Sequence, residues 1–148
     1  MNKDFVTYEL AKKLKEKGFR ELCLVYYTND NTLYYNYSHK AGACYTDCYL
    51  SHNLMPKDSV SGKFVDAPTI SQVLKWLREE KEIFIRVTLS YDYSTDADGE
   101  QVDRWTFWLF EVFSMGSGSL IYTEEISEYD SYEQAALAGV AYCLENLI

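Results

Sequence analysis

The chain has 148 residues, of which 47% are hydrophobic and 25% are charged. This length and balance are typical of one globular domain, so we predict a single α+β domain over residues 1–148 and exclude disorder as its main state. The formal net charge of −9 argues against nucleic acid as a partner, because a protein that neutralises phosphates needs an excess of Lys and Arg.

The negative charge is concentrated in one part of the chain. Residues 1–90 carry 13 Lys and Arg against 11 Asp and Glu, whereas residues 91–148 carry 12 acids against Arg104 alone. The first segment is therefore net +2 and the second net −11. Such an asymmetry is a hint about partners that the average charge would hide.

Targeting signals are not apparent in the sequence. Residues 1–5 lack the apolar run of a secretory signal, and the longest apolar stretch, 135–144, is about half the length of a membrane-spanning helix. We therefore predict a cytoplasmic protein that does not contact membranes. In that compartment its four cysteines are expected to be reduced thiols.

Three helices are predicted from capping residues and helical periodicity. The first covers residues 8–17 after the cap residue Thr7, and Gly18 ends it. The second begins after Thr69 and the third after Ser131. Each of these two caps is followed by a glutamine three residues later, which is the pattern of a capping box.

Strands are predicted between the helices. Residues 21–27 and 33–37 flank a turn at 29–31 and indicate a hairpin, while residues 83–93 alternate apolar and polar side chains. Two further strands, 102–113 and 120–124, follow turns that contain glycine. We predict an antiparallel sheet of about five strands with three helices mainly on one face, in the order α-β-β-(loop)-α-β-β-β-α.

Residues 38–67 show no periodicity and contain a candidate metal site. A structureless segment of this length indicates either a missed element or a functional loop. Two thiols and two imidazoles could complete a tetrahedral zinc site, but the separated ligand pairs of structural zinc sites are missing. We therefore predict no cofactor and keep zinc as the alternative, with the ligands His39, Cys44, Cys48 and His52.

Two charged clusters have competing interpretations. Asp96, Asp98 and Glu100 resemble the opening of a calcium loop, but Phe107 occupies the twelfth position, where a glutamate is required. We interpret them as an acidic hairpin tip that is a candidate binding surface. Four lysines and an arginine make the first helix basic, which we interpret as a solvated face: Lys12, Lys13, Lys15, Lys17 and Arg20.

The chain contains 14 tyrosines, and seven of them lie between residues 26 and 49. Tyrosine combines a rigid apolar ring with a polar tip, which suits contact surfaces. Alternation along a strand places Tyr34 on the opposite face from Tyr35 and Tyr37. These three are candidate binding residues, with packing against the sheet as the alternative.

Four segments resemble a known set of proteins: Phe5–Glu9 (FVTYE), Ala67–Gln72 (APTISQ), Trp76–Glu79 (WLRE) and Asp130–Ala135 (DSYEQA). The chain resembles a set of short uncharacterised proteins of Bacteroides-group gut bacteria and of their phages and mobile elements. The resemblance covers the three predicted helices, about a third of the chain. It implies an accessory protein of phages or mobile elements and brings no activity or cofactor. Within it, Trp76 and Arg78 are candidate contact residues, or else a packing residue and a partner of carboxylates.

We predict a non-enzymatic protein-binding module. It would present the tyrosine-rich hairpin or the acidic C-terminal hairpins to a protein such as a host factor or a defence protein, and an acidic mimic of nucleic acid belongs to the same class. The alternative is a small-ligand or nucleotide-binding protein or a hydrolase, with residues 38–67 as a lid. The absence of a known catalytic motif favours the first hypothesis without excluding an enzyme.

Overall fold

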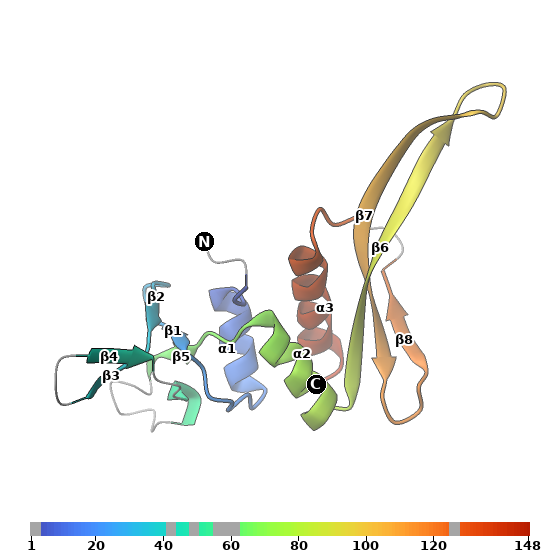
Figure 1. Ribbon diagram of the computed structural model, residues 1–148. Helices are drawn as coiled ribbons and strands as arrows, with labels where there is room; N and C mark the ends of the chain where they lie inside the picture. Colours follow the sequence, from blue (N-terminus) through green and yellow to red (C-terminus); the bar gives the residue numbers. More distant parts are fainter. Residues whose placement is uncertain (1–3, 41–43, 48–50, 55–62, 125–127) are drawn as a thin grey trace. The chain divides into compact units, whose positions relative to one another are not determined.

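A computed structural model of the protein describes residues 4–40, 44–47, 51–54, 63–124 and 128–148, with the backbone alone for 37–40 and 44–47 (Figure 1). Contacts between residues divide the chain into two compact units, one of residues 1–76 together with Ile148 and one of residues 77–147. None of the helices in the described ranges is long and apolar enough to cross a membrane.

The first unit contains helix α1 (Tyr8–Glu16), and its bounds match the prediction to within one residue. The Thr7 hydroxyl accepts a hydrogen bond from the backbone N–H of Leu10 at 3.4 Å, as expected of a cap. Gly18 follows the helix with a φ of 91°, a conformation that favours glycine. The buried face of α1 carries Leu10, Ala11 and Leu14.

The predicted hairpin is confirmed, and it belongs to a small sheet with the strand order β2-β1-β5. Strand β1 (Val25–Tyr27) pairs antiparallel with β2 (Leu33–Tyr35) on one side and with β5 (Val65–Asp66) on the other. Asn31 lies in the turn between β1 and β2 with a φ of 63°, which asparagine tolerates better than most residues.

Residues 38–67 contain regular structure that the sequence analysis missed. Strands β3 (Tyr37–Lys40) and β4 (Cys44–Asp47) form an antiparallel hairpin, and the 3₁₀ helix η1 (His52–Leu54) follows before β5. Each of these elements is two to four residues long. A periodic pattern needs a longer window, so none was visible.

Several smaller sheets take the place of the predicted single sheet of about five strands. The described residues form two three-stranded antiparallel sheets, β2-β1-β5 and β6-β7-β8, and the separate β3-β4 hairpin. The α+β class and the three helices are as predicted. The predicted count of about five strands is too low because β3, β4 and β5 are too short to show alternation, and the single sheet is wrong because alternation does not identify a strand's neighbour.

Helix α2 (Ile70–Glu80) follows the first unit's last strand and continues into the second unit. Its predicted capping box is present. The Thr69 N–H donates to Oε1 of Gln72 at 2.9 Å, and the Gln72 N–H donates to Oγ1 of Thr69 at 3.2 Å. Two backbone donors at the start of the helix are thereby satisfied.

The second unit is a three-stranded sheet with a helix on one face. Strands β6 (Ile83–Thr95) and β7 (Gln101–Ser114) pair from Ile83 opposite Ser114 to Thr95 opposite Gln101. Strand β8 (Leu120–Thr123) pairs with the other edge of β7. Helix α3 (Tyr132–Asn146) is capped by Ser131, whose hydroxyl accepts from the Gln134 N–H at 3.2 Å.

Helix α3 packs closely on β6 and β7 through Gly139. A Cβ atom at that position would lie 2.9 Å from Cγ2 of Ile85 and 3.1 Å from Cδ2 of Phe110. A side chain at this position would force Ile85 or Phe110 to shift, whereas glycine allows this approach of the helix to the sheet without that shift. Next to this contact, the rings of Tyr122 and Tyr142 stack with centroids 4.0 Å apart.

Candidate functional site

The hairpin of β6 and β7 is longer than the elements that cover it. The 13 residues of β6 span roughly 43 Å, whereas the 15 residues of α3 span roughly 22 Å. On the other edge of β7, Trp108 exchanges backbone hydrogen bonds of 2.8 and 3.0 Å with Tyr129. Beyond this bridge the hairpin projects past α3 and β8 (Figure 1). Residues 89–107 are called the arm below.

The arm carries large apolar side chains in contact with solvent. Their exposed fractions lie between 40% and 59% for Leu89, Tyr91, Tyr93, Val102 and Trp105. An isolated two-stranded hairpin is marginally stable in water, and apolar side chains on such a hairpin gain little from burial within it. Grouped exposed apolar side chains are typical of interaction surfaces.

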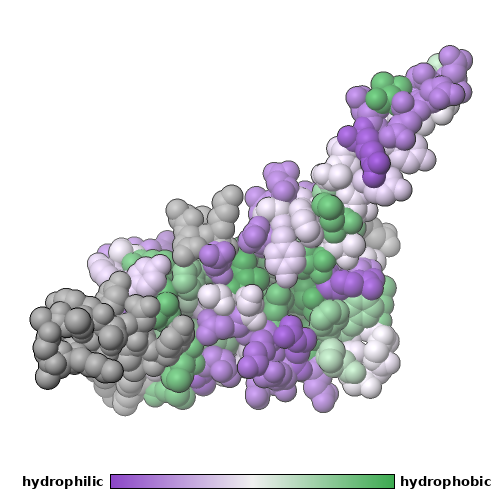
Figure 2. Space-filling model, in the orientation of Figure 1, coloured by the Kyte–Doolittle hydropathy of each residue, from purple (hydrophilic) through white to green (hydrophobic). Residues whose placement is uncertain are grey.

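The arm is also acidic. It contains five acids and one base, Arg104, so its net charge is −4: Asp92, Asp96, Asp98, Glu100 and Asp103. Figure 2 shows the end of the arm as mainly hydrophilic with hydrophobic atoms between the polar ones. The arrangement offers a partner both negative charge and aromatic rings.

The acidic tip is a hairpin turn, as predicted. Oδ1 of Asp96 accepts hydrogen bonds from the backbone N–H groups of Asp98 at 3.0 Å and Glu100 at 2.9 Å. Gly99 lies in the same turn with a φ of 82°. One of the acids therefore shapes the turn, and the exposed carboxylates of Asp98 and Glu100 project from it.

Two contacts hold the arm's aromatic side chains in place. The Arg104 guanidinium lies over the Tyr91 ring, 4.2 Å from its centroid. The indole N–H of Trp105 donates to Oε1 of Glu128 at 3.5 Å, from the segment that runs beside β7. Both rings keep a large exposed surface, so these contacts orient the rings without covering them.

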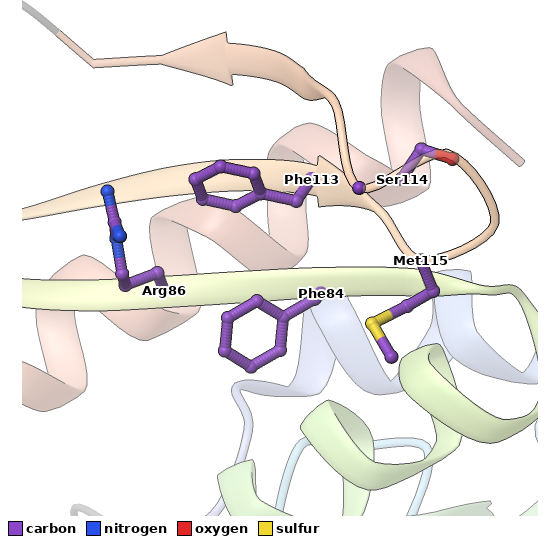
Figure 3. A pocket seen from close by; sticks show the side chains of 6 residues that line it. Phe84, Arg86, Phe113, Ser114 and Met115 are labelled. Carbon is purple, nitrogen blue, oxygen red and sulfur yellow. The ribbon is translucent and has the colours of Figure 1, made fainter.

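A shallow hollow lies at the base of the same hairpin, on the face of the sheet that includes Phe84, Arg86 and Phe113 (Figure 3). Its volume is about 240 Å³, below the ~300–1,000 Å³ of ordinary small-molecule sites. The Arg86 Nε and Nη2 atoms both lie 2.6 Å from Oε2 of Glu111, and this partner raises the pKa of Arg86. The hollow therefore offers a narrow apolar floor beside an ion pair.

The first unit contains a buried polar cluster around Asp66, which is fully buried. Its carboxylate accepts hydrogen bonds from the Ser51 hydroxyl at 3.0 Å and from the backbone N–H groups of His52 and Asn53, both at 2.9 Å. Burial raises the pKa of Asp66, although these hydrogen bonds act in the opposite direction. These hydrogen bonds to Asp66 hold η1 and the preceding residue Ser51 against β5.

The cluster contains the residue types of a hydrolase triad in a different arrangement. The Ser51 hydroxyl donates to Asp66, and Nε2 of His52 lies 3.0 Å from Oδ1 of Asn36. A triad needs the serine bonded to the histidine and the histidine bonded to the acid. Because all three residues are buried and their bonds follow another path, the geometry favours a structural role.

The tyrosine candidates lie on the β1-β2 hairpin and beyond it. Tyr34 is 48% exposed and Tyr35 is 41% exposed. The Tyr34 ring stacks on Tyr26 at 5.9 Å. Tyr37 begins β3, and its side chain lies outside the described residues. The described part of this surface is thus accessible to a partner.

The two candidates on α2 have different environments. Trp76 is 5% exposed, and its ring packs edge-on against Phe19 with centroids 5.5 Å apart. The structure therefore places Trp76 in the core of the first unit, where it cannot form a contact surface. Arg78 is exposed near the end of α2.

The proposed zinc ligands fall mostly outside the described side chains. His39 belongs to β3 and Cys44 to β4, for which the backbone is described, and Cys48 lies outside the described residues. His52 is buried against Tyr26, with ring centroids 4.4 Å apart. Among the described residues no three His, Cys, Asp or Glu side chains are grouped as a metal site would require.

The basic residues of α1 serve contacts within the first unit. Nζ of Lys15 donates to the Phe64 carbonyl at 2.8 Å, and Nη1 of Arg20 donates to the carbonyls of Lys15 at 2.9 Å and Phe19 at 2.8 Å. Lys17 bonds the carbonyl of the C-terminal Ile148. The sequence predicts only a solvated face for these residues, but Lys15, Lys17 and Arg20 bond to carbonyl oxygens of the first unit.

The sequence does not indicate the apolar arm residues as functional candidates, because the alternation of residues 83–93 predicts a strand whose apolar face is buried. A length comparison could have found them. A strand of this length paired with a second long strand exceeds what one helix of about 15 residues covers, so its far end must be exposed. The acids of the tip, Asp96, Asp98 and Glu100, were identified from the sequence and lie on the same arm.

Comparisons of the chain with models of protein families, with curated proteins and with solved structures give no match.

Proposed function

We propose that the chain is a non-enzymatic protein-binding module and that the arm is its contact surface. The observation that carries this proposal is the group of large apolar side chains on the arm, each 40% to 59% exposed, among five acids. A protein-protein contact buries such aromatic side chains at its centre and surrounds them with polar groups.

The charge of the arm selects the chemistry of the partner. Five acids against Arg104 favour a surface that presents Lys and Arg around an apolar depression. The resemblance of the three helices to accessory proteins of phages and mobile elements suggests a host factor or a defence protein as that partner. A nucleic-acid-binding protein has such a basic surface, so the arm could compete with its nucleic acid.

The first test compares two pairs of tyrosines in a quantitative pull-down from host lysate. Tyr91→Thr with Tyr93→Thr alters the arm, and Tyr34→Thr with Tyr35→Thr is the matched control on the β1-β2 hairpin. Threonine preserves strand propensity, so both variants should fold. A loss of ~1 kcal/mol or more at each of two tyrosines central to the interface would lower the recovery of a specific partner by more than ~10-fold.

The second test neutralises the acids that do not shape the turn. Asp98→Asn, Glu100→Gln and Asp103→Asn should slow association and reduce its dependence on salt, since charge complementarity acts mainly on the association rate. Equal recovery of every protein by the wild type and by both arm variants would contradict the proposal. Loss of binding in the β1-β2 variant alone would assign the contact to that hairpin.

A further inference from the structure

Strand β6 has an open edge in the part of the chain that the structure describes. The sheet order is β6-β7-β8, so β6 pairs with β7 on one side only. Its 13 residues contain two charged side chains, Arg86 and Asp92, and neither proline, glycine nor lysine. Natural proteins usually protect a long edge strand with proline, with charged side chains, especially lysine, or with a bulge. The β6 register shifts only near its far end, between Ser94 and Thr95.

The hydrogen bonds of β7 show which backbone groups of β6 face this edge. Trp108 directs both its N–H and its C=O toward Tyr129, on the side of β7 away from β6. Its partner Leu89 therefore belongs to a non-hydrogen-bonded pair and directs its own N–H and C=O to the open edge. Because these pairs alternate, the same holds for Ile85, Val87, Tyr91 and Tyr93.

We infer that this edge binds the same edge of a second copy of the chain, antiparallel, with a two-fold axis at Leu89. This pairing goes beyond the proposed function, which concerns a different protein: the pairing uses backbone groups at the edge of β6, whereas the proposed contact uses side chains of the arm, Leu89, Tyr91 and Tyr93 among them. Leu89 of one copy exchanges two backbone hydrogen bonds with Leu89 of the other, and the outward residues on either side continue the ladder. A continuous six-stranded sheet results.

The charges of β6 favour this register, in which Arg86 gains a second carboxylate beside Glu111 of its own chain. Arg86 and Asp92 lie three residues on either side of Leu89, so each Arg86 stands opposite Asp92 of the other copy, with Cα atoms ~4.5 Å apart. Moving the axis to Thr88 would place Arg86 opposite Ser90, and moving it to Ser90 would place Arg86 opposite Ser94. Only the axis at Leu89 pairs the two opposite charges of β6.

The apolar side chains of β6 match in the same register. Val87 lies opposite Tyr91 of the second copy, and Ile85 lies opposite Tyr93. In the single chain Leu89, Tyr91 and Tyr93 are 51% to 57% exposed, and these contacts would cover part of that surface. Because the strands are antiparallel, the two acidic tips lie at opposite ends of the pair, which limits their repulsion.

Sedimentation and light scattering over a range of concentrations test the dimer. The wild type should show twice the mass of one chain. Leu89→Pro removes an outward N–H without removing a bond to β7, and proline is tolerated at such edge positions. The loss of both central hydrogen bonds should raise the dissociation constant by ~10-fold or more. Leu89→Val retains the N–H and an apolar side chain, so it should remain a dimer.

Disulfide cross-linking tests the register, and it does not depend on how well the proline variant folds. In chains with Cys44→Ser and Cys48→Ser, a Thr88→Cys chain mixed with a Ser90→Cys chain should form a mixed disulfide faster than either chain alone. A monomeric wild type at high concentration, or a dimer that Leu89→Pro leaves intact, would overturn the inference. Dominant cross-linking of Thr88→Cys to itself would overturn the axis at Leu89.

Discussion

Replacing Asp66 with alanine should destabilise the first unit, because the carboxylate is the acceptor that satisfies two buried backbone N–H groups. These belong to His52 and Asn53, and each lies 2.9 Å from a carboxylate oxygen. A buried donor left without an acceptor costs ~1–3 kcal/mol. The Ser51 hydroxyl, 3.0 Å from Oδ2, can rotate toward another acceptor, so we count only the two N–H groups.

The gross loss is therefore ~2–6 kcal/mol for Asp66→Ala. Part of it is offset, because the substitution also removes a charge that is costly to bury, as the raised pKa of Asp66 shows. We expect a net loss of ~2–4 kcal/mol. Asp66→Asn retains one acceptor oxygen, so it should lose about half as much. The measurement is urea denaturation followed by circular dichroism and by tryptophan fluorescence.

The pH dependence of stability tests the same account in a second way. The pKa of Asp66 is raised in the folded protein relative to its ordinary value of 3.8. The folded state therefore holds the proton more tightly than the unfolded state, and the stabilisation by this group is greatest at a pH below 3.8. It should decline as the pH rises through 3.8 to the raised value, relative to Asp66→Asn. An Asp66→Ala variant within ~0.5 kcal/mol of wild type would refute the reasoning.

Three other outcomes follow from local geometry. Gly139→Ala should lose ~0–2 kcal/mol in denaturant unfolding, since overpacking against Ile85 and Phe110 costs ~1–3 kcal/mol and helix propensity returns ~1; a gain in stability, as expected at an uncrowded helix position, would contradict the close contact. Asp96→Ala should speed amide hydrogen exchange at Asp98 and Glu100, with global stability changed by less than ~1.5 kcal/mol because water can replace an exposed acceptor; unaltered exchange would contradict the turn. Burial raises the pKa of the Cys143 thiol to about 12 and also raises that of Cys23, so both should resist alkylation at pH 8 until the chain is unfolded. Rapid modification of either cysteine in the native protein would show that its unit opens.

The helices were predictable because their signals are local. The cap at Thr7 and the capping box at Thr69 lie within three residues of the backbone groups that they satisfy. The cluster around Asp66 was not predictable. Its partners are 13 to 15 residues away in sequence, and the short strand β5 that positions Asp66 has no periodicity.

Part of the candidate surface could be predicted from the sequence. The acids of the tip follow from composition and turn residues, whereas the exposure of Tyr91 and Tyr93 depends on where α3 ends relative to β6. Trp76 shows the converse case. The sequence leaves Trp76 as either a contact residue or a packing residue, and its position on the buried face of α2 places it against Phe19, as the second alternative expects. Periodicity shows which face of an element is apolar without showing how far that face is covered.

The tip and the edge of the same hairpin can serve two partners at once. Edge pairing uses the backbone of residues 85–93 and covers part of the Leu89, Tyr91 and Tyr93 side chains, whereas Val102, Trp105 and the acids at 96–103 remain outside the paired region. A pair of chains joined at Leu89 would then carry two acidic tips. A partner with two or more basic sites would bind both tips, and the second contact would form at a high effective concentration because the first already holds the two molecules together. Leu89→Pro should weaken binding to such a multivalent partner more than it weakens binding to a single site. Equal losses at both would mean that the edge itself contacts the partner.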